Sequence, residues 1–228
     1  VHDLKPAAMG IELTSHVQLW EHLCAESAEH IEAAPEKIFA EAQRRSGVEV
    51  TEDHVRARML AFLQERVIPT STLQAVVQSL LDGGIDVRVF GAGWRHSPVP
   101  ANRVKPLPVT PQECNKIYNA ARIVLLPVFT TDTAQHCLNV TIAGGCAVYR
   151  KPPRSLTELH PQLAQVLSRL PMLDDPRTAR KLIRSYLRDD EKRRAIHVEA
   201  RKMILDRHLW RHRLTTISEA LASPASTP

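Results

Sequence analysis

The sequence predicts an α/β fold, in which a parallel β-sheet is flanked by helices and lies between a helical N-terminal region and a helical C-terminal tail. Two apolar runs, residues 85–90 and 123–127, each end in a loop rich in glycine or hydroxyl residues, and a helix signal follows further along the chain. A third apolar run, residues 146–149, comes directly after the second of these helices. Strands and helices that alternate in this way form parallel sheets, whose carboxyl ends carry ligand-binding loops. The pattern therefore favours a ligand that carries phosphate.

Residues 1–70 are predicted to form a helical region of their own. Apolar residues recur at spacings of three and four over residues 15–30, which is typical of one face of an amphipathic helix. A second helix is predicted to end near Gly47, and Thr51 is predicted to cap a third helix that ends at Pro69. These helices need a surface on which to bury their apolar faces.

Residues 71–221 are predicted to form the α/β domain with its C-terminal helices, and residues 222–228 a flexible tail. Thr70 or Ser71 is expected to cap the first helix of this domain, and Thr110 to open a later helix in a capping box. The other strands and helices are expected at residues 85–90, 104–109 (a short edge strand or an extended loop), 123–127, 134–143, 146–149, 156–170, 175–187, 190–210 and 214–221.

Composition narrows the class of protein. The 228 residues include 30 basic and 25 acidic side chains, a formal charge of +5, but the basic segments also hold acidic residues, which is typical of solvated helix faces. Three Trp, three Tyr and four Phe are too few for a base-stacking surface, so nucleic acid is not an expected partner. No apolar run is long enough to span a membrane, and four scattered cysteines predict free thiols and a cytoplasmic location. The chain begins with Val1 and need not be complete.

Gly91 and Gly93 directly follow the first predicted strand. A residue without a Cβ allows close approach of the backbone to a ligand, or a positive φ in a tight turn. The spacing does not complete a GxGxxG fingerprint, so the sequence leaves both alternatives open, a backbone that approaches a ligand and a simple tight turn.

The segment 130–133 is a second candidate ligand loop, and it includes Thr131 and Thr133. The first turn of the helix that follows has unpaired N–H groups, which form a site for a diphosphate. Simple capping of the helix by Asp132 or Thr133 is equally compatible with the sequence. His136 and Asn139, three positions apart on this helix, share one face and could reach phosphate and a sugar hydroxyl.

No metal site or organic cofactor is predicted. His208 and His212 have a spacing found among metal ligands on helices, but the sequence offers no third ligand nearby and no HExxH pattern. The other histidines and the cysteines form no nucleophilic arrangement that the sequence reveals, and no nucleophile elbow is present.

Five segments stand in a distinctive order along the chain. They are the Gly-x-Gly-Trp turn after a strand, YNAARIVLLP (118–127), AGG (143–145), SYLRDDEKRRAI (185–196) and HLWRHRLTTI (208–217). Together they resemble the C-terminal half of CgeB-like glycosyltransferases, which are two-domain GT-B enzymes, over about residues 71–220. The resemblance implies a Rossmann-like domain that binds a nucleotide-sugar donor, opposite an N-terminal Rossmann-like domain that binds the acceptor.

The resemblance also implies roles for particular residues. The family's turn falls on Gly91, Gly93 and Trp94, and its asparagine-containing helix block falls on Tyr118 and Asn119. An Arg-x-Phe-Glu pattern of the family is replaced here by residues 136–139, with His136 at the position of the arginine and Asn139 at that of the glutamate. In the family these two residues are expected to offset diphosphate charge and to hydrogen-bond donor hydroxyls.

Two hypotheses of different classes follow. The first is a metal-independent glycosyltransferase donor half, in which the N–H groups from Thr133 to Gln135 stabilise the leaving diphosphate and the acceptor is unknown. Because residues 1–70 do not read as alternating strands and helices, the acceptor half would be missing or supplied by a partner chain. The second is a degenerate domain of this kind that acts as a protein-interaction module without catalysis. The residues at 136 and 139 favour the module, as would an exposed apolar face at residues 15–30.

Overall fold

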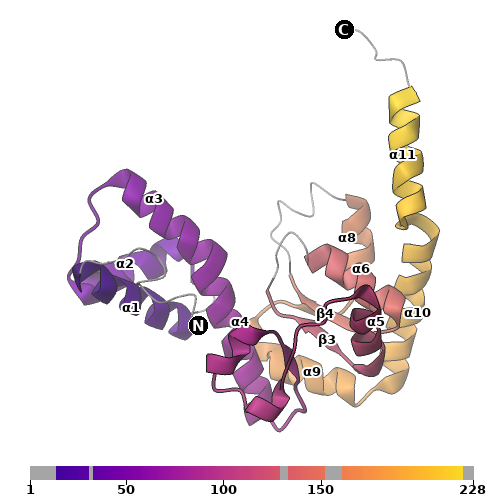
Figure 1. Cartoon of the computed structure of the whole chain (residues 1–228), viewed down its shortest axis with the longest axis horizontal. Helices are drawn as coiled ribbons and strands as arrows, with labels where there is room; N and C mark the ends of the chain where they lie inside the picture. The colour runs from indigo at the N-terminus through magenta and orange to yellow at the C-terminus, as the bar shows by residue number, and fades with distance from the viewer. Residues whose placement is uncertain (1–13, 31–32, 129–132, 152–160, 223–228) are drawn as a thin grey trace. The chain divides into compact units, whose positions relative to one another are not determined.

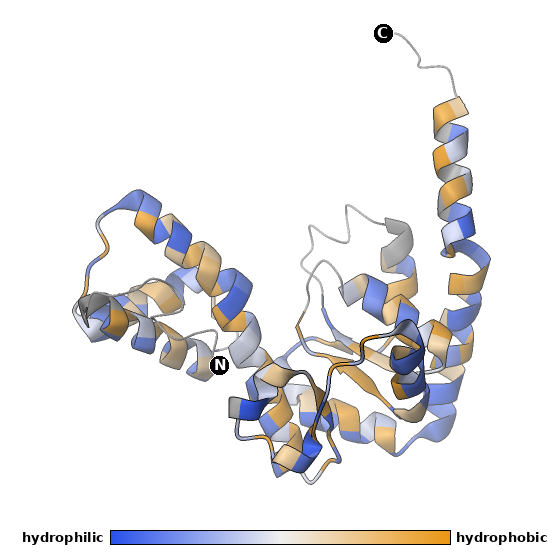
Figure 2. Cartoon of the chain, viewed as in Figure 1, coloured by the Kyte–Doolittle hydropathy of each residue, from blue (hydrophilic) through white to orange (hydrophobic). Residues whose placement is uncertain are grey.

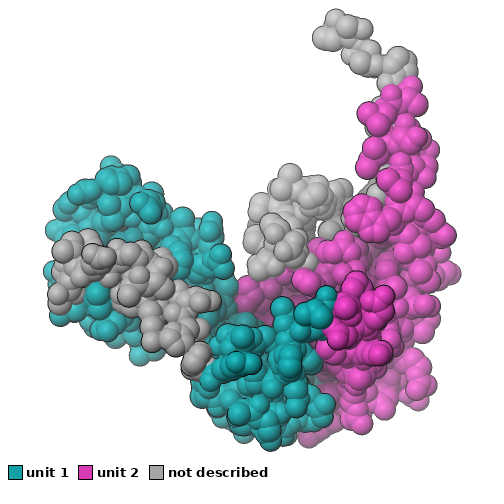
Figure 3. Space-filling model, viewed as in Figure 1, with its two compact units in different colours: residues 1–109, 173–184 teal, residues 110–172, 185–228 magenta. Residues whose placement is uncertain are grey.

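A computed structural model describes residues 14–30, 33–128, 133–151 and 161–222 (Figure 1). The chain divides into two compact units, Val1–Val109 with Leu173–Arg184 (unit 1) and Thr110–Met172 with Ser185–Pro228 (unit 2) (Figure 3). Small parallel sheets flanked by helices confirm the predicted α/β fold class.

Unit 1 begins with helices, as predicted. They are α1 (Thr14–Glu29), α2 (Pro35–Ser46), α3 (Asp53–Phe62), a π-helical segment η3 (Leu63–Val67) and α4 (Ile68–Asp82). The expected end of α2 is confirmed, since Gly47 follows it with a φ of 66°, a conformation that glycine adopts without strain.

Three predicted helix signals in unit 1 are wrong. Glu52, not Thr51, precedes α3, and its side chain makes no capping bond. Pro69 does not end a helix, because the π-helical segment stops just before it and proline is tolerated in the first turn of α4. Thr70 and Ser71 therefore lie inside α4 and cap nothing. The predicted domain boundary between residues 70 and 71 falls within this helix and stays a prediction.

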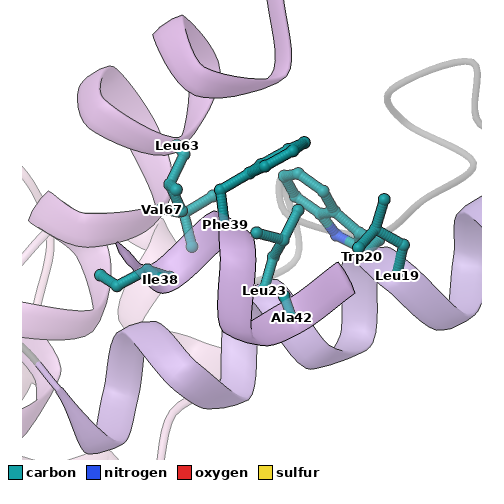
Figure 4. Packing of buried hydrophobic residues seen from close by; sticks show 8 residues of the cluster. All are labelled: Leu19, Trp20, Leu23, Ile38, Phe39, Ala42, Leu63 and Val67. Carbon is teal, nitrogen blue, oxygen red and sulfur yellow. The ribbon is translucent and has the colours of Figure 1, made fainter. Parts of the chain in front are cut away.

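The apolar face of α1 forms the core of the helical part of unit 1 (Figure 4). Leu19, Trp20 and Leu23 of α1 are at most 2% exposed and pack with five buried residues of α2 and η3. Beside this cluster the buried carboxylate of Glu26 contacts the Arg45 guanidinium, with 2.5 Å between Oε1 and Nη1. The face at residues 15–30 is thus covered inside its own unit.

A two-stranded parallel sheet completes unit 1. Strand β1 (Val89–Phe90) pairs with β2 (Val104–Lys105), with Val89 opposite Val104. Two short 3₁₀ helices, η4 (Ala92–His96) and η5 (Ala101–Arg103), connect these strands. The expected strands at 85–90 and 104–109 are longer than the observed ones, and Pro106 and Pro108 explain the second difference because they lack the N–H that a ladder needs.

Unit 2 contains strands β3 and β4 of a three-stranded sheet in the order β3-β4-β5, and its segment ends within β5 at Met172. Helix α5 (Pro111–Ala120) begins at the predicted capping box, in which the Glu113 N–H donates to the Thr110 hydroxyl oxygen and the Thr110 N–H to the Glu113 carboxylate. Strand β3 (Val124–Leu126), helix α6 (Thr133–Ala143) and strand β4 (Ala147–Arg150) then form a parallel β-α-β unit, with Leu126 opposite Tyr149. The short strand β5 (Met172–Leu173) was not predicted.

The helices after β4 confirm the predicted helical C-terminal part. They are α8 (Pro161–Leu167), a 3₁₀ turn η6 (Pro176–Thr178), α9 (Ala179–Leu187), α10 (Asp190–Arg207) and α11 (Trp210–Ala222). In unit 2 the strands are hydrophobic and α10 is largely hydrophilic (Figure 2). The Tyr149 hydroxyl donates to the Leu167 carbonyl at 2.9 Å inside the core. The predicted flexible tail lies outside the described residues, except for Ala222.

No helix among the described residues is long and apolar enough to cross a bilayer.

Candidate functional site

The carboxyl end of β3 and the start of α6 lie at one edge of the sheet of unit 2. Thr133, the first residue of α6, is 3% exposed, and its hydroxyl donates to the Val128 carbonyl at 3.2 Å. A hydroxyl has one proton, so in this arrangement it has none for a phosphate oxygen. The N–H groups of the first turn of α6 are further donors at this edge. Thr131 lies outside the described residues.

The exposed face of α6 holds three predicted site residues. Gln135, His136 and Asn139 are all exposed, while Cys137 and Val140 on the opposite face are fully buried. The Gln135 side-chain amide donates to the Asn139 amide oxygen at 3.0 Å. The structure thus brings these residues together on one solvated face, as their spacing predicts.

Arg150 is a candidate that the sequence analysis missed. It is the last residue of β4, and because Leu126 pairs with Tyr149, it lies at the same carboxyl edge as Pro127. Its side chain is half-buried, and Lys151 follows it. Two consecutive basic residues at the end of a buried strand are the signal that could have revealed it.

Tyr118 lies toward the other edge of the sheet. A Cβ on Gly145 would stand 2.8 Å from the Tyr118 carbonyl oxygen, and one on Gly144 would stand 2.5 Å from the Asn119 Oδ1. Because Gly145 precedes β4 whereas Thr133 follows β3, the main chain of Tyr118 is not brought together with Thr133. Its half-buried ring packs on the core, and burial, with a smaller effect of Cys114, raises the pKa of its hydroxyl. A donor-binding role for Tyr118 stays a prediction.

Gly91, Gly93 and Trp94 belong to unit 1, directly after β1. Gly91 has a φ of 111°, so the tight turn requires glycine there. A Cβ on Gly93 would meet no atom within 4 Å, which leaves its backbone open to a ligand. Trp94 is half-buried against the small core around Val89, and its carbonyl accepts from the Ser97 hydroxyl at 2.6 Å. A role in donor binding stays a prediction for all three residues.

One group of potential metal ligands occurs in the described part of the chain. Ligand atoms of Glu26, Glu29 and His30 all lie within 4.8 Å of one another. The Glu26 carboxylate, however, already contacts the Arg45 guanidinium, which would repel a second cation. We assign this group to the packing of α1 on α2.

Comparison with known proteins gives the class. The sequence model of a family described as glycosyl transferase-like matches residues 66–219, more than half of the chain. The chain belongs to the glycosyl transferase-like family. The match begins in η3 and ends in α11, so it includes both predicted ligand segments of this glycosyl transferase-like chain. No curated protein and no solved structure matches it significantly.

Proposed function

We propose that the chain is the donor-binding half of a CgeB-like GT-B enzyme, which transfers a sugar from a nucleotide diphosphate to an acceptor. The observation that carries the proposal is the β3-α6-β4 unit. It places the amino end of α6 after a parallel strand in a family of sugar transferases. Ligands of open parallel sheets bind at this edge, and helix amino ends favour anions.

The carboxyl edge of the sheet, where α6 begins and Arg150 lies (the donor edge), would act on the leaving group. As the acceptor oxygen bonds to the anomeric carbon, the bond from that carbon to the diphosphate oxygen breaks, and negative charge grows on the diphosphate. The N–H groups at the start of α6 and the Arg150 guanidinium would stabilise that charge without a metal ion. The acceptor's proton passes to a base that these residues do not supply.

His136 and Asn139 weaken the donor site compared with the family pattern. Histidine carries a full charge only when protonated, and a neutral amide accepts hydrogen bonds less strongly than a carboxylate. Both side chains are exposed on α6, so substitutions there leave the core intact. The double variant H136R/N139E should therefore bind a nucleotide-sugar donor more tightly than the wild-type chain does.

The acceptor half would come from outside the described helices. The described residues of α1, α2 and α3 form a helical cluster rather than a Rossmann-like domain. We infer that a further segment of a longer chain, or a partner chain, binds the acceptor. Four free cysteines support a cytoplasmic location for the assembly.

Thermal unfolding with a panel of nucleotide sugars at millimolar concentration tests the proposal. A ligand at 100 times its Kd stabilises the native state by about 2.7 kcal/mol, which raises the Tm. The R150Q variant should lose most of that rise relative to its own Tm. R207Q, on the exposed end of α10, should keep it. If no donor raises the Tm of either the wild-type chain or H136R/N139E, that result would contradict the proposed function.

The residues at 136 and 139 also favour the second candidate, an interaction module that has lost catalysis. The other observation that would have favoured the module, an exposed apolar face at residues 15–30, is not found, because the apolar face of α1 is buried. The donor panel separates the two candidates. A module derived from a transferase predicts no donor binding by the wild-type chain and restored binding by H136R/N139E.

A further inference from the structure

A pocket lies at the amino edge of the sheet of unit 2, where β3 and β4 begin. Its volume is about 350 Å³. Arg122 lines it just before β3, and Cys146 lines it just before β4. This is the end of the parallel strands opposite to the one that leads into α6.

One face of α10 forms the remaining wall. Asp190, Arg193, Arg194 and His197 line the pocket, and they stand at positions i, i+3, i+4 and i+7 of a helix of 18 residues. This spacing puts them on a single side of the helix. Helix α10 packs on α6, and these four side chains line the same pocket as Arg122 and Cys146 at the strand starts.

The charges in the pocket leave a positive excess. The Arg193 guanidinium is only 11% exposed and donates to the Asp190 carboxylate and to the Tyr186 carbonyl. The acidic side chain of the pocket is thus already neutralised. Arg122 and Arg194 are exposed, and neither forms an ion pair with any residue in the described ranges.

The other polar groups add no negative charge. Burial raises the pKa of the Cys146 thiol to about 11, although Arg193 acts in the opposite direction, so the thiol stays protonated at neutral pH. Burial also lowers the pKa of His197, and Arg201 lowers it further against a hydrogen bond to the Gly145 backbone. The His197 Nδ1 is buried without a hydrogen-bond partner among the described residues.

We propose that this pocket binds the phosphate group of a small metabolite, at a site separate from the donor edge. Two guanidinium groups present paired N–H donors that match phosphate oxygens. A pocket of this volume is at the low end for small-molecule sites, which fits a molecule the size of a sugar phosphate. The site goes beyond the proposed function and does not depend on it.

Histidine ring signals of the labelled full chain, followed by NMR during titration, test the proposal. The probes are inorganic phosphate and glycerol 3-phosphate, with glycerol as the uncharged control, at constant ionic strength. Both phosphates should shift the His197 signal with saturation at millimolar concentration, and glycerol should not. A lower Kd for glycerol 3-phosphate would indicate a metabolite, whereas equal Kd values would restrict the site to the phosphate group.

Variants at the two exposed arginines locate the binding. R122Q/R194Q should weaken phosphate binding by about tenfold or more, because both guanidinium groups are lost while the exposed positions leave the fold unchanged. R207Q, on the same helix but away from the pocket, should bind phosphate as the wild type does. Equal phosphate binding by R122Q/R194Q, or a His197 signal that does not shift in the wild type, would overturn the proposal. Neither result would affect the thermal-unfolding test of donor binding with nucleotide sugars.

Discussion

Replacing Leu23 with alanine tests whether the apolar face of α1 is a core or a docking surface. Leu23 is 0% exposed and packs with seven other buried residues (Figure 4). The substitution removes about three methylene-sized groups at about 0.8 kcal/mol each, or about 2.4 kcal/mol of transfer free energy. The cavity left behind adds to this, and buried Leu→Ala changes cost about 2.7 to 5 kcal/mol. We expect the free energy of unfolding to fall by about 3 kcal/mol.

Urea unfolding measured by the fluorescence of Trp20 is the assay. Trp20 is 2% exposed in the same cluster, and changing Trp94 and Trp210 to phenylalanine makes it the only tryptophan. The midpoint should fall while the slope stays constant. Glu21→Ala, on the exposed side of α1, is the control and should change stability by less than about 0.5 kcal/mol. A loss below about 1 kcal/mol for Leu23→Ala would refute the packing argument and return α1 to the candidate docking surfaces.

Three further predictions concern unit 2. Gly145→Ala should destabilise the chain by about 1 to 3 kcal/mol in urea unfolding, because its Cβ would stand 2.8 Å from a main-chain carbonyl of α5. An unchanged midpoint would show that α5 shifts to accommodate the methyl group. Tyr149→Phe should lower stability by about 1 kcal/mol, since the Leu167 carbonyl loses a 2.9 Å hydrogen bond but keeps the N–H of Leu170; a loss above about 3 kcal/mol would point to a larger role for the hydroxyl. Burial raises the pKa of the Cys137 thiol from 9.0 to about 12, so the folded chain should resist alkylation there at mildly alkaline pH, as mass spectrometry would show. Between pH 9.0 and about 12 this thiol ionises only in the unfolded chain, so the free energy of unfolding should fall as the pH rises through this range. A rise in the free energy of unfolding over this range would contradict the burial of Cys137.

Local signals in the sequence were reliable where three or four neighbouring residues decide the structure. The capping box at Thr110 and the helix end at Gly47 were both predicted, because each depends on the backbone next to it. The cap expected at Thr70 or Ser71 failed for the complementary reason. A π-helical segment before Pro69 lets the helix path continue, and nothing in the local pattern reports that change of helix type.

The candidate site shows the same division. The shared face of His136 and Asn139 follows from helix geometry, and the sequence was enough to predict it. The position of Arg150 at the same edge of the sheet as Pro127 depends on the register between β3 and β4, which pairs residues more than twenty positions apart. Sequence patterns do not state which residues of two strands face each other, so this candidate emerged only from the sheet.

The sequence by itself determined the α/β class, most of the helices, the free cysteines and the family resemblance. These properties arise from hydrophobic periodicity and residue type, which are local. Tertiary structure decided that the α1 face is a core, that Tyr118 and Thr133 lie toward opposite edges of a sheet, and that Arg122 lines one pocket together with α10. Packing and strand register set these relations, because they join residues that are distant along the chain and close in space.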